Sequence, residues 1–178
     1  MSFIAAPTLT TERLRLRAFR TDDFEDHAAL WADPIVVQHI SGTPASLSDS
    51  WLSLMRGMGA WPMLGYGYWV VEDLHDQTFY GEVGIADYFR DMQPSIRGIP
   101  EAGWVLTPKA HGKGIATEAM RAVLSWADEH LDMPKTVCIL DEDFMASKNV
   151  ALKLGFKDAL NTEFRGRPTL LMERVKAS

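Results

Sequence analysis

Residues 101–120 read EAGWVLTPKAHGKGIATEAM, and this stretch decides the fold. It passes from an apolar run, 101–106, through a loop with two glycines into an amphipathic pattern over 115–131. Apolar residues recur in that pattern at three- and four-residue spacing, which predicts a helix. A second apolar run follows at 135–140. Strand, long helix and strand in this order predict a right-handed crossover between parallel strands.

The patterns on either side of this unit predict the rest of a mixed sheet. The alternation of leucine and arginine in 13–19 indicates a half-buried strand, and a helix that Thr21 caps and Pro34 ends follows it. We therefore expect an α/β (α+β) domain over residues 1–178, with a core of about 9–176, about seven strands and four helices. The other expected elements are a helix at 47–58, a hairpin of strands 66–73 and 79–89, a helix at 146–154 that ends at Gly155, and a hairpin over 159–176.

Composition excludes several classes of function. The net charge of −6 and the pI of about 5.3 argue against nucleic-acid binding. The single cysteine, Cys138, lies in an apolar run and reads as a buried strand residue, and no Cys/His cluster has metal spacing. The start has no signal-peptide pattern, and the most apolar stretch, 59–71, is too short to span a membrane. We expect a cytoplasmic protein without a metal or a membrane partner.

The loop at 107–114 has the properties of a phosphate cradle. Gly112 and Gly114 lack Cβ atoms, so the backbone approaches an anion closely, and the first N–H groups of the following helix are free. The spacing matches neither the nucleotide P-loop nor the dinucleotide fingerprint, because Lys113 lies between the glycines and Thr117 holds the third-glycine position. A pyrophosphate held by backbone donors, a nucleotide, and a plain glycine turn all stay open from these residues alone.

The chain resembles the GNAT-type N-acetyltransferases, in the branch of the ribosomal-protein alanine N-acetyltransferases (RimJ/RimL-like). The loop KAHGKG, 109–114, and its continuation IATEAM resemble the acetyl-CoA loop of that family. The opening LTTERLRLRAFRTDDF and the stretch ASKNVALKLGF, 146–156, resemble further blocks of the branch, in the same order. The resemblance covers nearly the whole chain. It implies the GNAT-like fold, with a splay between strands 101–106 and 135–140.

The resemblance also implies a co-substrate, acetyl-CoA, and the residues that hold it. The pantetheine arm would pair with the strand before the loop, and the pyrophosphate would lie on the loop and the helix start, without a metal. The implied cofactor-binding residues are Trp104, Val105, Leu106, Lys109, His111, Gly112, Lys113, Gly114, Ile115, Ala116, Thr117 and Asn149. Of these, Lys109 replaces the usual Gln or Arg of the motif, and His111 replaces an aromatic residue and reads as a solvated loop histidine.

The implied reaction is direct attack of a neutral amine on the thioester. Glu101 and, after it, Glu82 are the candidates for the general base. Ser147 is the candidate acid for the leaving thiolate, or the N-cap of its helix, or both. The family's Asn and Tyr are replaced by Phe144 and Ala151.

These replacements keep a second interpretation open, a non-catalytic acyl-CoA-binding or sensing module. The acceptor is a protein N-terminus or a small-molecule amine, and the chain is a monomer or a homodimer. Four aromatic residues could line an acceptor pocket: Trp31, Trp51, Trp61 and Tyr66.

Overall fold

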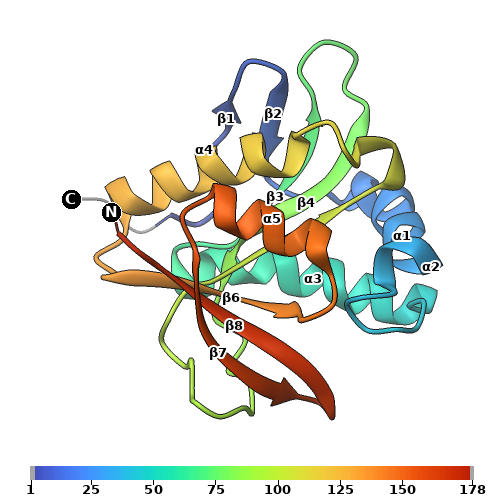
Figure 1. Cartoon of the computed structure of the whole chain (residues 1–178). Coiled ribbons are helices and arrows are strands. Elements are labelled where there is room, and N and C mark those ends of the chain that lie inside the picture. Colours follow the sequence, from blue (N-terminus) through green and yellow to red (C-terminus); the bar gives the residue numbers. More distant parts are fainter. Residues whose placement is uncertain (1–2, 177–178) are drawn as a thin grey trace.

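A single mixed sheet organises the chain. The structure, a computed structural model, describes residues 3–176, without the side chains of 158 and 159; residues 1–2 and 177–178 of the expected domain lie outside the described part. The sheet has the strand order β1-β2-β3-β4-β5-β6-β8-β7 (Figure 1). The predicted α/β class is confirmed. The described residues form eight strands and five α-helices, compared with about seven and four expected.

The elements lie close to the predicted ranges. The strands are β1 (Leu9–Thr10), β2 (Leu14–Arg17), β3 (Tyr68–Asp73), β4 (Phe79–Ala86), β5 (Glu101–Leu106), β6 (Lys135–Asp141), β7 (Lys157–Phe164) and β8 (Arg167–Val175). The helices are α1 (Phe24–Ala32), α2 (Pro34–Val37), α3 (Leu47–Leu64), α4 (Ile115–His130) and α5 (Met145–Lys153), with short 3-10 turns η1 (Thr21–Asp23) and η2 (Pro108–Ala110).

Helices cover both faces of the sheet (Figure 1). On one face, α4 packs Ala119, Met120 and Val123 against strand residues such as Ala102 and Leu106, which form the main core. On the opposite face, α1, α2 and α3 contribute to a second cluster around Val70 of β3. Trp31, one of the residues expected around an acceptor, packs on this second face, which is therefore called the acceptor face below. No described helix has both the length and the apolarity needed to span a bilayer.

The first helical region differs from the expectation for identifiable reasons. Thr21 is not an N-cap: it lies inside η1, because the Asp23 carboxylate reaches back and accepts the Arg20 N–H at 2.6 Å. Pro34 follows the end of α1 as expected, but it also opens α2, since proline suits a first helical position. The side chain of Asp33 caps α2 by accepting the Ile35 N–H at 2.8 Å.

Helix α3 continues past the expected end at residue 58 to Leu64, despite Pro62. Trp61 explains the extension, because it is buried between Trp69 and Trp126 and donates its indole N–H to the Tyr68 carbonyl at 3.0 Å. Gly65, with a φ of 78°, then ends the helix in the left-handed conformation.

Candidate active site

The sheet opens between β5 and β6. These parallel strands pair only at Glu101 and Val137, and beyond that point they diverge. The Val137 N–H donates to the Pro100 carbonyl at 3.0 Å, whereas the Thr107 N–H donates at 2.8 Å to Tyr80, on the β4 side. Successive residues of a strand direct their backbone groups to opposite sides. The backbone groups of Trp104 and Leu106 therefore face the gap, where no strand pairs with them.

The glycine loop lies at the open end of this gap. Gly112 and Gly114 have φ angles of 72° and 78°, in the left-handed region that favours glycine. The first N–H of α4 with a backbone partner is that of Glu118, which donates to the Gly114 carbonyl at 3.0 Å. The N–H groups of Ile115, Ala116 and Thr117 precede it and stay available at the positive end of the helix dipole. The loop and the gap thus offer an anion site beside an unpaired strand edge.

Two residues that the sequence did not single out hold this loop. Arg13 donates from Nη1 to the Lys113 carbonyl at 3.1 Å and from Nε to the Glu118 carboxylate at 2.7 Å. Glu118 also accepts the Thr11 hydroxyl at 2.6 Å. Burial alone would raise the pKa of Glu118, but the hydrogen bonds from Thr11 and Arg13 outweigh it and lower the pKa. These contacts, called the Arg13–Glu118 clamp, tie the loop to the β1–β2 segment.

The sequence predicted a solvated loop histidine at position 111. His111 is exposed, but its ring also contacts the backbone. Its Nε2 lies 2.9 Å from the Leu106 carbonyl, one of the backbone groups that face the gap. A carbonyl only accepts, so Nε2 carries the proton and donates. The contact fixes the start of the loop against the end of β5. Lys109, the other unusual position of the motif, is exposed on η2.

Ser147 lies beside β5 but does not cap its helix. Helix α5 begins at Met145 with Phe144 as the N-cap residue, so Ser147 is already inside the helix. Its hydroxyl accepts the indole N–H of Trp104 at 3.3 Å. The hydroxyl proton stays available to a partner in the gap. The N-cap interpretation is therefore wrong, and Asn149 lies exposed on the same helix.

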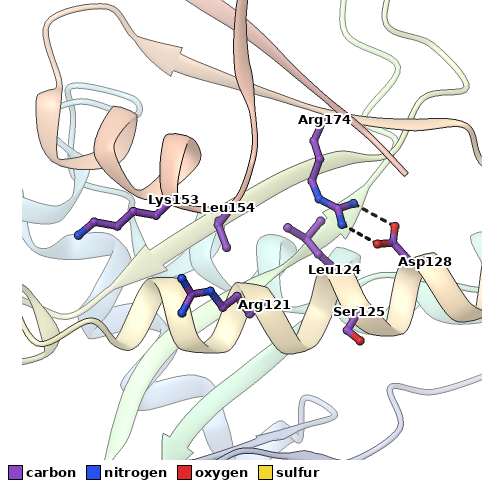
Figure 2. A pocket seen from close by; sticks show the side chains of 7 residues that line it. All are labelled: Arg121, Leu124, Ser125, Asp128, Lys153, Leu154 and Arg174. Carbon is purple, nitrogen blue, oxygen red and sulfur yellow. Dashed lines mark hydrogen bonds and ion pairs between the residues drawn. The ribbon is translucent and has the colours of Figure 1, made fainter. Parts of the chain in front are cut away.

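A groove of about 290 Å³ lies between α4, α5 and β8. Figure 2 shows Arg174 and Asp128 paired in it, at 2.5 and 2.9 Å, and the side chains of Arg121 and Lys153 that border it. Arg121 and Lys153 are exposed. Arg121 follows the free N–H groups of α4 by about one turn, so the groove begins about one turn further along the helix.

On the acceptor face, both predicted bases are buried and paired. Glu101 is 4% exposed, and its two oxygens accept from Arg90 Nε and Nη2 at 2.5 and 2.7 Å. The Arg90 guanidinium lies between the rings of Tyr88 and Phe164, at 4.8 Å from each. Both oxygens of Glu101 thus contact the guanidinium, and the carboxylate is closed to solvent.

Glu82 is also 4% exposed. One of its oxygens pairs with His27 Nδ1, and the other accepts the Trp31 indole N–H at 3.4 Å. His27 is 1% exposed, and its Nε2 is buried without a hydrogen-bond partner among the described residues. Glu82 thus stays a prediction as a base, in a setting closed to solvent.

Tyr68 of β3 lies on the acceptor face, next to Gly103 of β5. A Cβ on Gly103 would lie 2.1 Å from the Tyr68 hydroxyl, so only glycine leaves room for this phenol. Burial, followed by the neighbouring Tyr88, raises the pKa of Tyr68 well above its ordinary value. Both phenols stay protonated at neutral pH and serve as hydrogen-bond donors. The sequence offered no signal for Tyr68 beyond its place in a strand.

A further group at the gap comes from the segment after α2. His39 Nδ1 lies 3.3 Å from the Asp141 carboxylate at the end of β6, and the His39 ring stacks on Phe144 at 4.2 Å. Arg167 donates to the same carboxylate at 2.9 Å. Phe144 stands where the acetyltransferase branch that the sequence resembles has asparagine. In this chain, the position therefore supplies a ring that stacks on a histidine.

The four aromatic residues expected around an acceptor do not form one pocket. Trp61 and Tyr66 are buried in the main core, while Trp51 contacts Phe24 on the outer side of the α1–α3 layer. Only Trp31 reaches the acceptor face, through Glu82. Cys138 is buried as predicted, and burial, reinforced by Glu101, raises the pKa of its thiol. The described residues contain no group of three or more His, Cys, Asp or Glu that could hold a metal ion.

Fold and site together define a class of protein: a mixed α/β domain with a splayed strand pair that could hold an extended ligand, and a helix start that could hold its anionic group. Comparison with known proteins agrees. The family model described as "Acetyltransferase (GNAT) domain" matches residues 13–157, more than half of the chain. The chain belongs to the GNAT acetyltransferase family.

Solved structures show the same fold over nearly the full length. A GnaT-family acetyltransferase from Bordetella pertussis is 26% identical, with a TM-score of 0.84, and the match covers 96% of this chain and 100% of that one. A spermidine N-acetyltransferase from Vibrio cholerae, solved with CoA and spermine, is 16% identical with a TM-score of 0.74, over 93% and 97% of the chains. The RimL ribosomal L7/L12 alpha-N-protein acetyltransferase with CoA is 15% identical with a TM-score of 0.78, over 95% and 98%.

The last two likenesses, at this identity, concern the fold alone. The family match confirms the expected GNAT acetyltransferase, a family that uses acetyl-CoA, and favours it over a non-catalytic module and a nucleotide-binding protein.

Proposed function

We propose that the chain transfers acetyl from acetyl-CoA to a primary amine that approaches over the acceptor face. The observation that carries the proposal is the unpaired edge of β5, where the backbone of Trp104 and Leu106 faces the gap. That edge lies directly before the glycine loop and the free N–H groups of α4. An extended arm in the gap and a pyrophosphate at the helix start use the two features at once.

The chain's own residues supply the chemistry around the thioester. The Trp104 N–H would polarise the carbonyl oxygen from the gap. The Ser147 hydroxyl, held through the Trp104 indole N–H, would donate to the leaving sulfur. Glu101 and Glu82 stay the predicted carboxylates of the site, and each is buried and paired, with Arg90 and His27 respectively.

We further propose that Arg121 and Lys153 interact with the phosphate on the ribose of the coenzyme. They are exposed cations at the groove that begins about one turn of α4 beyond the free N–H groups (Figure 2). Charge on exposed groups contributes modestly, so we expect a loss of affinity of about three- to tenfold when either cation is removed. Dephospho-CoA lacks this phosphate, so its affinity should not change in the same variants.

For the acceptor, two structural neighbours support different classes of amine, a polyamine and a protein N-terminus. One was solved with spermine and the other is a ribosomal-protein acetyltransferase. The panel of acceptors should therefore contain peptides with free N-termini, amino acids, polyamines and aminoglycosides. Assembly as a monomer or a homodimer stays part of the proposal, and light scattering in solution distinguishes the two.

Thermal unfolding tests cofactor binding, and release of the CoA thiol tests transfer. Acetyl-CoA should raise the melting temperature by mass action. Gly114→Val should remove the shift, because Gly114 has a φ of 78° and a side chain there is strained. Gly98→Val is the matched control, since Gly98 has the same φ in a distant loop. An unchanged melting temperature at millimolar acetyl-CoA would contradict the proposal.

A further inference from the structure

The general base is the part of the reaction that the predicted carboxylates leave unassigned. Glu101 and Glu82 are each 4% exposed, and both oxygens of each accept from a neighbouring side chain. An acceptor amine needs a basic group that it can reach from the gap. Burial separates both carboxylates from solvent, so an accessible group at the rim of the gap meets this need better.

His39 is such a group, and its position follows from the strand register. Glu101 of β5 is level with Val137 of β6, and the strands are parallel. Four residues further along, Val105 is therefore level with Asp141 across the gap. Val105 pairs in turn with Glu82 of β4. Glu82, Val105 and Asp141 thus form a row across three strands.

All three side chains of this row lie on the acceptor face. Val105 packs against the cluster that α1, α2 and α3 cover, and Glu82 contacts α1. Asp141 contacts His39, in the segment that follows α2. The row begins with one histidine–carboxylate pair, His27–Glu82, and ends with another, His39–Asp141, on the two sides of the gap.

The tautomer of His39 follows from its partner. Burial alone would raise the pKa of Asp141, but the Asp143 N–H, His39 and Arg167 outweigh it and lower the pKa. An ionised carboxylate only accepts, so His39 Nδ1 donates to it. This leaves the lone pair on Nε2. The side chain is 26% exposed, so Nε2 is reachable, unlike that of His27 at 1%.

The neighbours of His39 hold the ring in place. It stacks on Phe144 with an angle of 9° between the planes. The charged groups that face the pair are Asp141 itself from β6 and Arg167 from β8. Arg167 also donates to the carbonyls of Gln38 and Ile40, on either side of His39. The imidazole is thus fixed on both sides, by its stacking partner and by its backbone.

We propose that His39, oriented by Asp141, is the general base that takes the proton from the acceptor amine. This inference rests on the acetyltransferase function proposed above. The nitrogen–carbon bond forms as the carbon–sulfur bond breaks, and the amine proton passes to His39 Nε2. His39 then returns that proton to solvent water, and the thiolate takes one from the Ser147 hydroxyl, which solvent reprotonates. Amine and thioester become amide and thiol.

The test compares His39→Ala and Asp141→Asn with the parent and with His75→Ala, a control in an exposed turn. General-base catalysis contributes about 10²- to 10⁴-fold, so His39→Ala should lower kcat at least about a hundredfold. The Kd for acetyl-CoA should stay within about twofold, since none of these contacts involves the glycine loop. The limb of the pH–kcat profile at the low-pH side should disappear, and added imidazole should restore part of kcat in His39→Ala.

Two results would overturn the inference. One is a kcat of His39→Ala close to that of the parent. The other is a low kcat that imidazole does not raise and that keeps the parent's pH limb, since this is what loss of a purely structural contact produces. Thermal unfolding of each variant shows whether it is folded.

The acceptor enters the test as the most active amine of the panel. If the parent binds acetyl-CoA but acetylates no amine of the panel, the choice of acceptor has failed. The variants are then compared by hydrolysis of acetyl-CoA, in which water takes the place of the amine. If the parent does not bind acetyl-CoA, the proposed function itself has failed.

Discussion

Substitution of Arg13 should weaken acetyl-CoA binding although Arg13 lies outside every motif of the loop. The guanidinium donates to the Lys113 carbonyl at 3.1 Å and lies 2.6 Å from the Glu118 carboxylate. Arg13→Gln removes both contacts. It also leaves the charge of Glu118 uncompensated in the first turn of α4, where the pyrophosphate would bind. We expect the Kd for acetyl-CoA to rise about tenfold, which corresponds to about 1.4 kcal/mol.

A second substitution, at Glu118, separates the loss of the loop contact from the effect of the uncompensated charge. Glu118→Gln releases the loop but also removes the repulsive charge, so its effects on binding oppose each other and the Kd should change by less than about threefold. The double variant lacks the uncompensated charge, so it should bind acetyl-CoA more tightly than Arg13→Gln alone. Isothermal titration calorimetry gives the four dissociation constants. Glu129→Gln, at the exposed far end of the same helix, is the matched control.

The free energy of unfolding should respond in a different order. Glu118 accepts the Thr11 hydroxyl and the Arg13 N–H at 2.6 and 3.0 Å, and its side chain is 19% exposed, so Glu118→Gln should cost about 1–2 kcal/mol. The Arg13 side chain is 47% exposed, and solvent screening reduces the cost of Arg13→Gln to about 0.5–1 kcal/mol. Urea denaturation at neutral pH measures both.

The pH dependence of this difference has a defined sign. The pKa of Glu118 in the folded chain lies below its ordinary value of 4.5. Its contribution to stability is therefore complete above that ordinary value and is lost as the pH falls through the lowered folded pKa. The gap in stability between the parent and Glu118→Gln should close on acidification. Two findings would refute the clamp: a gap that widens below the ordinary pKa, or a double variant that binds more weakly than Arg13→Gln.

Three further predictions concern the acceptor face and the core. Gly103→Ala should destabilise the fold by about 1–3 kcal/mol, because its Cβ would lie 2.1 Å from the Tyr68 hydroxyl; the double variant with Tyr68→Phe should recover part of this in urea denaturation. Burial raises the pKa of Cys138, so iodoacetamide should label it in urea but not in the native protein at neutral pH. Arg90→Met should destabilise more than Arg90→Lys, because it leaves Glu101 buried without a cation, and thermal unfolding measures the difference.

The sequence predicted the crossover well because its signals are local. Residues 101–140 contain a strand, a glycine loop, an amphipathic helix and a strand in direct succession, and each has its own periodicity. The structure agrees to within a residue: β5 is Glu101–Leu106, α4 is Ile115–His130 and β6 is Lys135–Asp141. A crossover of this kind has one favoured hand and one edge for ligands, so the glycine loop could be placed as well.

The contacts that complete the site could not be predicted, because they join distant single side chains. Arg13 and Glu118 are 105 residues apart, and His39 and Asp141 are 102 apart. A lone arginine on an alternating strand has the same pattern whether it faces solvent or a helix start. His39 lies in an irregular segment without periodicity. No local pattern distinguishes such residues from solvated ones.

The prediction for Ser147 shows a different limit, the exact start of a helix. A serine near the beginning of 146–154 fits an N-cap, but α5 begins earlier, at Met145. Phe144 precedes that start and stacks on His39, a residue more than a hundred positions away. A tertiary contact thus coincides with the boundary of the helix and leaves the serine hydroxyl turned toward Trp104.

The carboxylates of the acceptor face share one property that bears on the chemistry. Glu101 and Asp141 pair with Arg90 and Arg167, and Glu82 pairs with His27. A free carboxylate in a low-dielectric site would raise the pKa of the acceptor amine, because an opposite charge stabilises the cation. The acceptor would then stay in its ammonium form. The ammonium form has no lone pair with which to attack. Glu101 and Asp141 already have arginine partners and exert less of this effect, so the site favours a neutral amine and a neutral base that the amine can reach rather than another anion.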